Sequence, residues 1–222
     1  MNLCFDFDGP IIDVSDRYYR AYLESLKDVP INKEQILTKA DFWKLKQNRI
    51  TDLEIGVLSG LGISESIIST EVRKELVFKQ ESVYLDKLFD DVFKVFDYLR
   101  SKNKSILLVT LRREKELLFI MEELKLRKYF TNEKLFALTD EQMPLNDIQA
   151  KHLLLVKAIN RLSLNPEETC IIGDSDTDIH AGRLAKYGRI IAISRGIRSK
   201  LQLSILKPDY IIDNLTEFLN LL

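Results

Sequence analysis

The chain opens with the stretch NLCFDFDGP, residues 2–10, an apolar run that ends in two aspartates, a glycine and a proline. A run this short, stopped by glycine and proline, predicts a buried strand that enters a turn. Alternation along a strand sends the side chains of Asp6 and Asp8 to the same side and that of Phe7 into the core. Two carboxylates at the end of a buried strand are costly unless a cation meets them. The stretch therefore predicts either a cation-dependent site or, more simply, a solvated acidic turn.

Short apolar runs recur later in the chain and alternate with amphipathic stretches. The runs that predict strands are 105–109, 169–172 and 190–193, with weaker ones at 135–138 and 210–212. The stretches that predict helices are 114–126, 147–162 and 177–186. Such alternation is typical of a parallel sheet with helices on both faces. We therefore expect an α/β fold with a doubly wound, mostly parallel sheet.

Residues 15–88 interrupt this alternation, because they contain no convincing strand. Aromatic and aliphatic residues recur there at helical spacing, as at Tyr18 and Tyr22. This block predicts an all-helical domain inserted after the first strand. The core domain would then consist of residues 1–14 and 89–222, and the inserted domain of residues 15–88.

The composition excludes several classes of protein. The 222 residues include 33 Lys and Arg and 34 Asp and Glu, so the net charge of −1 gives no general reason to bind nucleic acid or an anionic membrane. No apolar run reaches the roughly 18 residues of a membrane-spanning helix, and no basic and apolar leader precedes the first motif. Cys4 and Cys170 lie in apolar runs, which indicates buried thiols in a reducing, cytoplasmic compartment. We expect no nucleic-acid or membrane partner, and the oligomeric state stays open.

Three further features place chemical groups near the ends of predicted strands and helices. Asp174 and Asp178 follow the strand at 169–172, although Ser175 or Asp176 in this segment could simply cap the next helix. Thr110 ends another strand, where a turn residue is the plain alternative, and Lys151 near a helix start could be a solvated charge. Ligands of open α/β sheets bind at the carboxyl ends of the strands. Strand-end aspartates there would form an all-oxygen pocket that suits Mg²⁺ beside a substrate phosphate.

Taken in order, these motifs resemble those of the haloacid dehalogenase superfamily of aspartate-nucleophile phosphotransferases. The order is a strand ending in DxD, a strand ending in Thr, a lysine at a helix start and a strand ending in GDxxxD. The resemblance covers nearly the whole chain, and the helical insert lies where members with a small helical cap, the C1 type, carry theirs. The tail at 193–199 and 208–212 is similar to that of the phosphoglycolate-phosphatase-like and β-phosphoglucomutase-like branch.

The resemblance implies a role in phosphoryl transfer for each acidic motif residue. Asp6 would be the nucleophile that forms an aspartyl-phosphate. Asp8 would be the general acid and then the general base, and its backbone carbonyl would also reach the metal. Asp174 would complete a Mg²⁺ site with Asp6, and Asp178 would support that site.

The remaining motif residues imply the rest of the chemistry and separate its branches. Thr110 and Lys151 would bind the phosphoryl oxygens, and Lys151 would also offset the carboxylate charge. Asp8 supplies the acid that an alcohol leaving group needs and a halide does not, so it favours a phosphatase or phosphomutase over a dehalogenase or phosphonatase. Tyr18 stands where many capped phosphatases and sugar phosphomutases carry a histidine, which weakens the phosphomutase alternative. Pro10 stands where the family more often has Thr or Val, and it removes a backbone N–H.

The resemblance thus predicts a Mg²⁺-dependent phosphatase that hydrolyses a small phosphorylated metabolite. The substrate would be a phosphate monoester such as phosphoglycolate, a sugar phosphate or a nucleotide. The alternatives are a phosphomutase of the same fold and a non-catalytic binding protein that retains the fold.

Four basic residues are candidates for substrate specificity. Lys44, Lys46 and Arg49 of the inserted domain could meet a second anionic group of the substrate, and the simpler interpretation is a solvated basic helix face. Arg112, two residues after Thr110, could contact the substrate, but we favour a solvated residue at the start of a helix.

Overall fold

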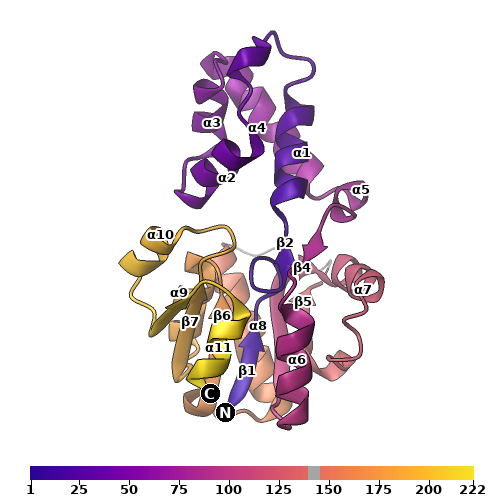
Figure 1. The fold of residues 1–222 in the computed structure, drawn as a ribbon, viewed down its shortest axis with the longest axis vertical. Coiled ribbons are helices and arrows are strands. Elements are labelled where there is room, and N and C mark those ends of the chain that lie inside the picture. Colours follow the sequence, from indigo (N-terminus) through magenta and orange to yellow (C-terminus); the bar gives the residue numbers. More distant parts are fainter. Residues whose placement is uncertain (140–145) are drawn as a thin grey trace. The chain divides into compact units, whose positions relative to one another are not determined.

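The computed structural model describes residues 1–139 and 146–222 and divides the chain into two compact units (Figure 1). The core unit consists of Met1–Ile12 and Leu88–Leu222, and the helical unit of Asp13–Lys87. The chain passes between them in two short strands, β2 (Ile12–Asp13) and β3 (Lys87–Leu88). Within the described residues, no helix has the length and apolarity needed to cross a membrane.

The core unit is built on a six-stranded parallel sheet with the order β5-β4-β1-β6-β7-β8. Its strands are β1 (Asn2–Phe5), β4 (Ile106–Arg113), β5 (Leu135–Leu138), β6 (Thr169–Gly173), β7 (Arg189–Ile193) and β8 (Tyr210–Ile212). The predicted α/β fold with a mostly parallel sheet is confirmed. The chain moves outward from β1 to β5 and then returns to β6 on the other side of β1. This reversal places a topological switch point, where ligands bind in such sheets, between β1 and β6.

Helices cover both faces of the sheet, because alternate side chains of its strands point to opposite faces. The main helices of the core are α6 (Val92–Ser101), α7 (Glu114–Glu123), α8 (Asp147–Leu162), α9 (Asp176–Leu184), α10 (Lys200–Ile205) and α11 (Leu215–Phe218). Phe5 of β1 packs edge-on against Phe96 of α6 and Phe218 of α11, with ring centroids 5.3 and 6.1 Å away. The next residue toward the N-terminus, Cys4, joins a cluster with side chains of α8 and α9 on the opposite face. Cys4 and Cys170 are buried free thiols, as predicted.

The register of the central strands brings the motifs to one edge of the sheet. Phe5 pairs with Leu108 of β4 and with Ile172 of β6. Thr110, which was predicted to end a strand, lies instead within β4, which continues to Arg113. The aspartates that follow β1 and β6 lie at the carboxyl ends of these neighbouring strands. This is the edge at which ligands bind in open α/β sheets.

The helical unit contains α1 (Ser15–Ser25), α2 (Lys39–Gln47), α3 (Asp52–Leu58), α4 (Ile63–Val77) and α5 (Gln80–Val83). Four short 3₁₀ turns complete the described chain, at Lys33–Gln35 in this unit and at Asn132–Lys134, Pro166–Glu168 and Leu219–Leu221 in the core. Tyr22 of α1 stacks on Phe42 of α2 at 4.9 Å between ring centroids, in a cluster with Leu26, Ile55 and Leu61. The helical unit therefore has a hydrophobic core of its own.

Tyr22 also carries a polar contact inside that core. Its hydroxyl lies 2.7 Å from Ser59 Oγ and accepts a hydrogen bond from the backbone N–H of Leu37 at 3.0 Å. The Tyr22→Phe variant keeps the ring packing but leaves the Leu37 N–H without this acceptor. We expect it to lower the free energy of unfolding by about 1–2 kcal/mol, measured by urea denaturation. Tyr98→Phe, at a side chain 41% exposed, is the control and should change it by less than about 0.5 kcal/mol. Equal effects of the two variants would contradict the structural role of the Tyr22 hydroxyl.

Candidate active site

The loop after β1 forms a tight turn that carries the first two aspartates. The N–H of Asp6 donates to the Ile172 carbonyl at 2.9 Å, so the strand pairing continues up to the carboxylate. Gly9 has φ of +94°, and its N–H donates to Ile12 at 2.8 Å. The donors of this turn come from residues on either side of Pro10, so the N–H that proline lacks is not needed for the turn.

Three carboxylates meet at the edge of the sheet between β1 and β6. One oxygen each from Asp6, Asp174 and Asp178 lies within 4.8 Å of the others. Lys151 of α8, only 1% exposed, reaches into this cluster. Its Nζ donates to Asp6 Oδ1 at 2.7 Å and lies 2.8 Å from Asp178 Oδ1. The structure thus brings together four of the residues predicted from sequence.

The charges of this cluster do not balance. Burial, and after it the neighbouring Asp178 carboxylate, raise the pKa of Asp6 to about 7 against the pull of Lys151. Burial and the carboxylates of Asp178 and Asp6 also raise the pKa of Asp174 well above its usual range. Burial lowers the pKa of Lys151, but the two carboxylates it contacts outweigh this and raise it overall. One ammonium group against three buried carboxylates leaves an excess of negative charge, and an oxygen-only donor set with this charge fits a divalent cation such as Mg²⁺.

Asp174 is held in place by the backbone around it. Its Oδ2 accepts a hydrogen bond from the N–H of Ile197 at 2.5 Å. A Cβ added at Gly9 would lie 2.2 Å from that oxygen, and one added at Gly196 would lie 1.9 Å from it. Only glycine at these two positions allows both loops to approach the carboxylate this closely.

Asp178 has two structural partners besides Asp6 and Asp174. Ser175 is the N-cap of α9, and its Oγ donates to Asp178 Oδ2 at 2.6 Å in a reciprocal capping box. The other carboxylate oxygen faces Lys151. The alternative that a residue of this segment caps the next helix is therefore confirmed for Ser175, and Asp178 takes part in both the cap and the acidic cluster.

Thr110 and Arg112 lie next to the acidic cluster on β4, and the interpretation of Arg112 as a solvated helix-start residue is wrong. β4 continues to Arg113, and Arg112 is buried within it. Its Nη2 donates to Asp8 Oδ1 at 2.6 Å, and its guanidinium lies 5.2 Å from the centroid of the Phe7 ring. Its backbone N–H donates to Thr110 Oγ1 at 3.1 Å. Arg112 therefore contacts the loop of the first motif and the hydroxyl of the second.

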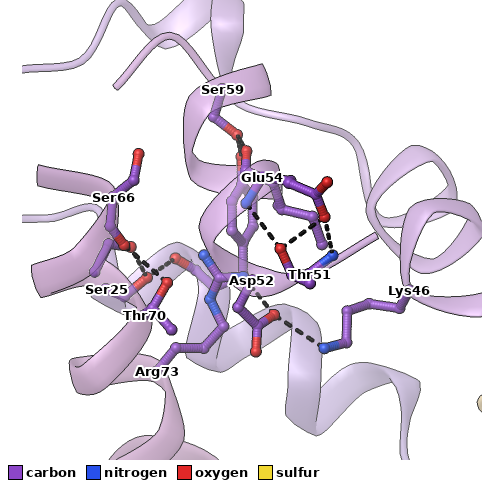
Figure 2. A network of polar contacts seen from close by, with 12 residues as sticks. Ser25, Lys46, Thr51, Asp52, Glu54, Ser59, Ser66, Thr70 and Arg73 are labelled. Atoms are coloured by element: carbon purple, nitrogen blue, oxygen red, sulfur yellow. Dashed lines mark hydrogen bonds and ion pairs between the residues drawn. The ribbon is translucent and has the colours of Figure 1, made fainter. Parts of the chain in front are cut away.

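The basic residues predicted in the inserted domain lie in the helical unit and differ from one another. Lys44 and Arg49 are exposed, whereas Phe42 on the same helix as Lys44 is fully buried in the hydrophobic core of this unit. Lys46 is not free on a solvated face, because its Nζ donates to Asp52 Oδ1 at 2.9 Å. The same oxygen accepts a hydrogen bond from Nη1 of the buried Arg73 at 2.8 Å, and Figure 2 shows these side chains together. Lys46 is thus part of the internal ion pairing of the helical unit.

Two contributors to the site were not predicted from the sequence. Both lie in the loop after β7. The N–H of Ile197 donates to Asp174, and Gly196, which has no side chain, leaves room for the Asp174 carboxylate. A glycine three residues after a predicted strand, at the same edge as the acidic motifs, was the available signal. Its role depends on a close approach that spacing along the chain does not reveal.

Comparison with known proteins identifies the family and the fold of this chain. A family model described as haloacid dehalogenase-like hydrolase matches residues 1–186. The pyrophosphatase PpaX of Bacillus mycoides is 23% identical over 232 residues, covering 98% of this chain and 94% of the relative. A phosphoglycolate phosphatase of Aquifex aeolicus is 22% identical, covering 99% and 95%. The structure of a haloacid dehalogenase-like family hydrolase from Streptococcus pneumoniae superposes with a TM-score of 0.72 at 20% identity, covering 99% of this chain and 96% of that one.

Because the acidic cluster carries excess negative charge, we expect that neutralising one of its carboxylates will stabilise the folded state, whereas most substitutions of buried residues destabilise it. Because burial and the neighbouring carboxylates raise its pKa, Asp174 destabilises the folded state at pH 8, where the unfolded chain ionises this carboxyl group at no such cost. The Asp174→Asn variant keeps an oxygen for the Ile197 N–H and removes the charge. In EDTA at pH 8 we expect its Tm to exceed that of the unmodified protein by about 2–4 °C, the equivalent of about 1 kcal/mol.

The matched control for this prediction is Asp213→Asn. Hydrogen bonds from Lys200 and Ser194 lower the pKa of the exposed Asp213, so neutralising it should not stabilise the protein. Differential scanning calorimetry of both variants in EDTA measures the two effects. A lower Tm for Asp174→Asn than for the unmodified protein would show that the acidic cluster is not under repulsion.

Proposed function

We propose, since the chain belongs to the haloacid dehalogenase-like hydrolases, that its core site is that of a Mg²⁺-dependent phosphatase acting on small phosphate monoesters. The observation that carries this proposal is the buried cluster of Asp6, Asp174 and Asp178 with Lys151. A nucleophilic carboxylate, a set of cation ligands and a fixed ammonium group are the components that phosphoryl transfer needs.

The reaction would proceed in two displacements at phosphorus. In the first, an oxygen of Asp6 attacks phosphorus and forms the aspartyl-phosphate, while the bond to the leaving alcohol oxygen breaks and Asp8 gives that oxygen a proton. In the second, Asp8 takes a proton from water, whose oxygen attacks phosphorus. The bond between phosphorus and Asp6 then breaks, and inorganic phosphate leaves. The carboxyl groups of Asp6 and Asp8 are then back in their starting states.

The cation would be held by the carboxylates of Asp6 and Asp174 and by the backbone carbonyl of Asp8, with Asp178 supporting the site. When bound, it supplies positive charge that reduces repulsion between the nucleophile and the anionic phosphoryl group. Lys151, fixed between Asp6 and Asp178, would bind a phosphoryl oxygen. Thr110 would donate its hydroxyl hydrogen to another, because its oxygen already accepts from the Arg112 N–H.

Arg112 would affect this reaction through its hydrogen bond to Asp8. A buried guanidinium donating to Asp8 Oδ1 at 2.6 Å fixes one orientation of that carboxyl group. A general acid has to lie within hydrogen-bond reach of the leaving oxygen, so its orientation matters as much as its acidity. We therefore assign Arg112 to the support of Asp8 in place of the specificity role considered from the sequence.

The substrate would be a small phosphorylated metabolite. Relatives that align along nearly the whole chain are named as phosphatases of phosphoglycolate and of pyrophosphate, both of them small anions. Lys44 and Arg49 remain the exposed basic candidates for binding a second anionic group. Lys46 is less suited to this role, because it is paired with Asp52.

The first test is the hydrolysis of p-nitrophenyl phosphate by the unmodified protein and by Asp6→Asn, each with Mg²⁺ and with EDTA. The amide cannot form the acyl phosphate, so we expect kcat to fall by about 10³-fold or more, and EDTA should abolish activity of the unmodified protein. Asp213→Asn, at an exposed carboxylate, is the control and should keep full activity. Activity in Asp6→Asn equal to that of the control would refute Asp6 as the nucleophile.

The role of Asp8 predicts a dependence on the leaving group. In Asp8→Ala, p-nitrophenolate can still leave without a proton, but the base for the second displacement is missing. We expect a burst of about one p-nitrophenolate per enzyme followed by slow turnover, measured by stopped flow. An alkyl phosphate such as glycerol phosphate should give no burst, and its turnover should fall by about 10²–10⁴-fold. Equal losses on both substrates without a burst would argue against Asp8 as the acid and base.

A further inference from the structure

Arg195, in the loop after β7, is bound on three sides. Its Nη1 donates to Asp91 Oδ1 at 2.7 Å, and its Nη2 donates to the backbone carbonyl of Pro10. Its guanidinium lies 4.0 Å from the centroid of the Phe89 ring. These contacts join parts of the core unit that are far apart in the sequence, and the side chain is only 12% exposed.

The anchor of this guanidinium is itself fixed. Asp91 Oδ2 accepts hydrogen bonds from the backbone N–H groups of Leu215 at 2.7 Å and Thr216 at 3.3 Å. One oxygen of Asp91 therefore holds the start of α11, and the other holds Arg195. A guanidinium restrained in this way is preorganised to hold the Pro10 carbonyl in one position.

The Pro10 carbonyl belongs to the loop that carries Asp8. That loop packs against Asp174 at Gly9, where an added Cβ would lie 2.2 Å from the carboxylate oxygen. The same oxygen of Asp174 accepts a hydrogen bond from the N–H of Ile197, two residues after Arg195. The loop after β7 thus holds Asp174 by its backbone and the opposing loop by the Arg195 side chain.

We propose that Arg195 is a positioning residue that, through the Pro10 carbonyl, holds the Asp8-bearing loop against Asp174 and so sets the geometry of the cation site and of the general acid. This role rests on the proposed phosphatase function. Arg195 does not face the substrate in this role, so it acts on cation affinity and on turnover and not on substrate binding. Displacements of about 1 Å between reacting groups cost up to about 10²-fold in rate.

The experiment compares Arg195→Met with Arg198→Met. Arg198 lies in the same loop and its Nε donates to Asp176 at 2.9 Å, so the control loses a similar side chain and an ion pair. The Mg²⁺ concentration for half-saturation is read from the rise of Tm with Mg²⁺, which needs no turnover. Steady-state kinetics with p-nitrophenyl phosphate at saturating Mg²⁺ give kcat and KM separately.

We expect Arg195→Met to raise the half-saturating Mg²⁺ concentration by about 10-fold and to lower kcat by about 10–100-fold, with KM within about 2-fold of the unmodified value. Arg195→Lys should recover most of both losses, because Nζ can donate to the Pro10 carbonyl while pairing with Asp91. Arg198→Met should leave both quantities unchanged. Equal effects of Arg195→Met and Arg198→Met, or a loss confined to KM, would overturn the proposal.

Asp91→Asn tests the same role if Arg195→Met does not fold. It removes the charge that anchors Arg195 and keeps an oxygen for the N–H groups of α11. The half-saturating Mg²⁺ concentration should rise by about 3-fold, and an unchanged value would overturn the proposal. Failure of the proposed function is a separate result, since it is seen as absence of hydrolysis by the unmodified protein, whereas the thermal measurement still compares the variants.

Discussion

The mutual repulsion of three buried carboxylates is the constraint on which the rest of the core site depends. Lys151 offsets part of it by contacting both Asp6 and Asp178, and it lies near the start of α8, a helix whose buried side chains pack in the core cluster of the sheet. The Ile197 N–H and the Ser175 cap each donate to one of the other carboxylate oxygens. These donors keep the carboxylates in place without neutralising them, and burial, together with the neighbouring carboxylates, raises the pKa of Asp6 and of Asp174. A site so arranged is stabilised by a cation and weakened by its own charge in the cation's absence, a compromise that a purely structural loop has no need to make.

Most of the fold followed from local pattern, because each strand and helix is specified by residues close together in the sequence. The apolar runs and amphipathic stretches predicted the parallel sheet and the helical insert, and the strand ends predicted the positions of Asp6 and Asp174. Thr110 was expected at a strand end and lies inside β4. The convergence of these residues is a consequence of topology, since parallel strands on either side of a switch point end at one edge. For the same reason, the sequence could indicate the acidic cluster before any distance was known.

The sequence could not show which charged side chains pair with residues that are distant in the sequence, and such pairing decides whether a charge is solvated or buried. Arg112 meets Asp8 across 104 residues, and Arg195 meets the Pro10 carbonyl across 185. The prediction for Arg112 was wrong because burial of a guanidinium is unfavourable unless an acid meets it, and the acid that does so, Asp8, is distant in the sequence. Lys46 illustrates the same limit in the helical unit, where its partner Asp52 is near in sequence but is identified only when α2 and α3 are seen together (Figure 2). The spacing of residues along the chain reveals which of them share a helix or strand. It does not reveal which charged side chains are already engaged in ion pairs.

Pro10 shows how a departure from the usual motif can be accommodated. A residue without an N–H cannot donate to the rest of the turn, so the turn is closed by the N–H groups of its neighbours and by the positive φ of Gly9. The carbonyl of Pro10 is one of the groups through which the rest of the core holds this loop, and Arg195 contacts it. Because Gly9 packs against Asp174, any force on that carbonyl acts on the distance between the first motif and the last. The loop after β7 therefore belongs to the site as much as the aspartates do, although it contributes no acidic side chain to it.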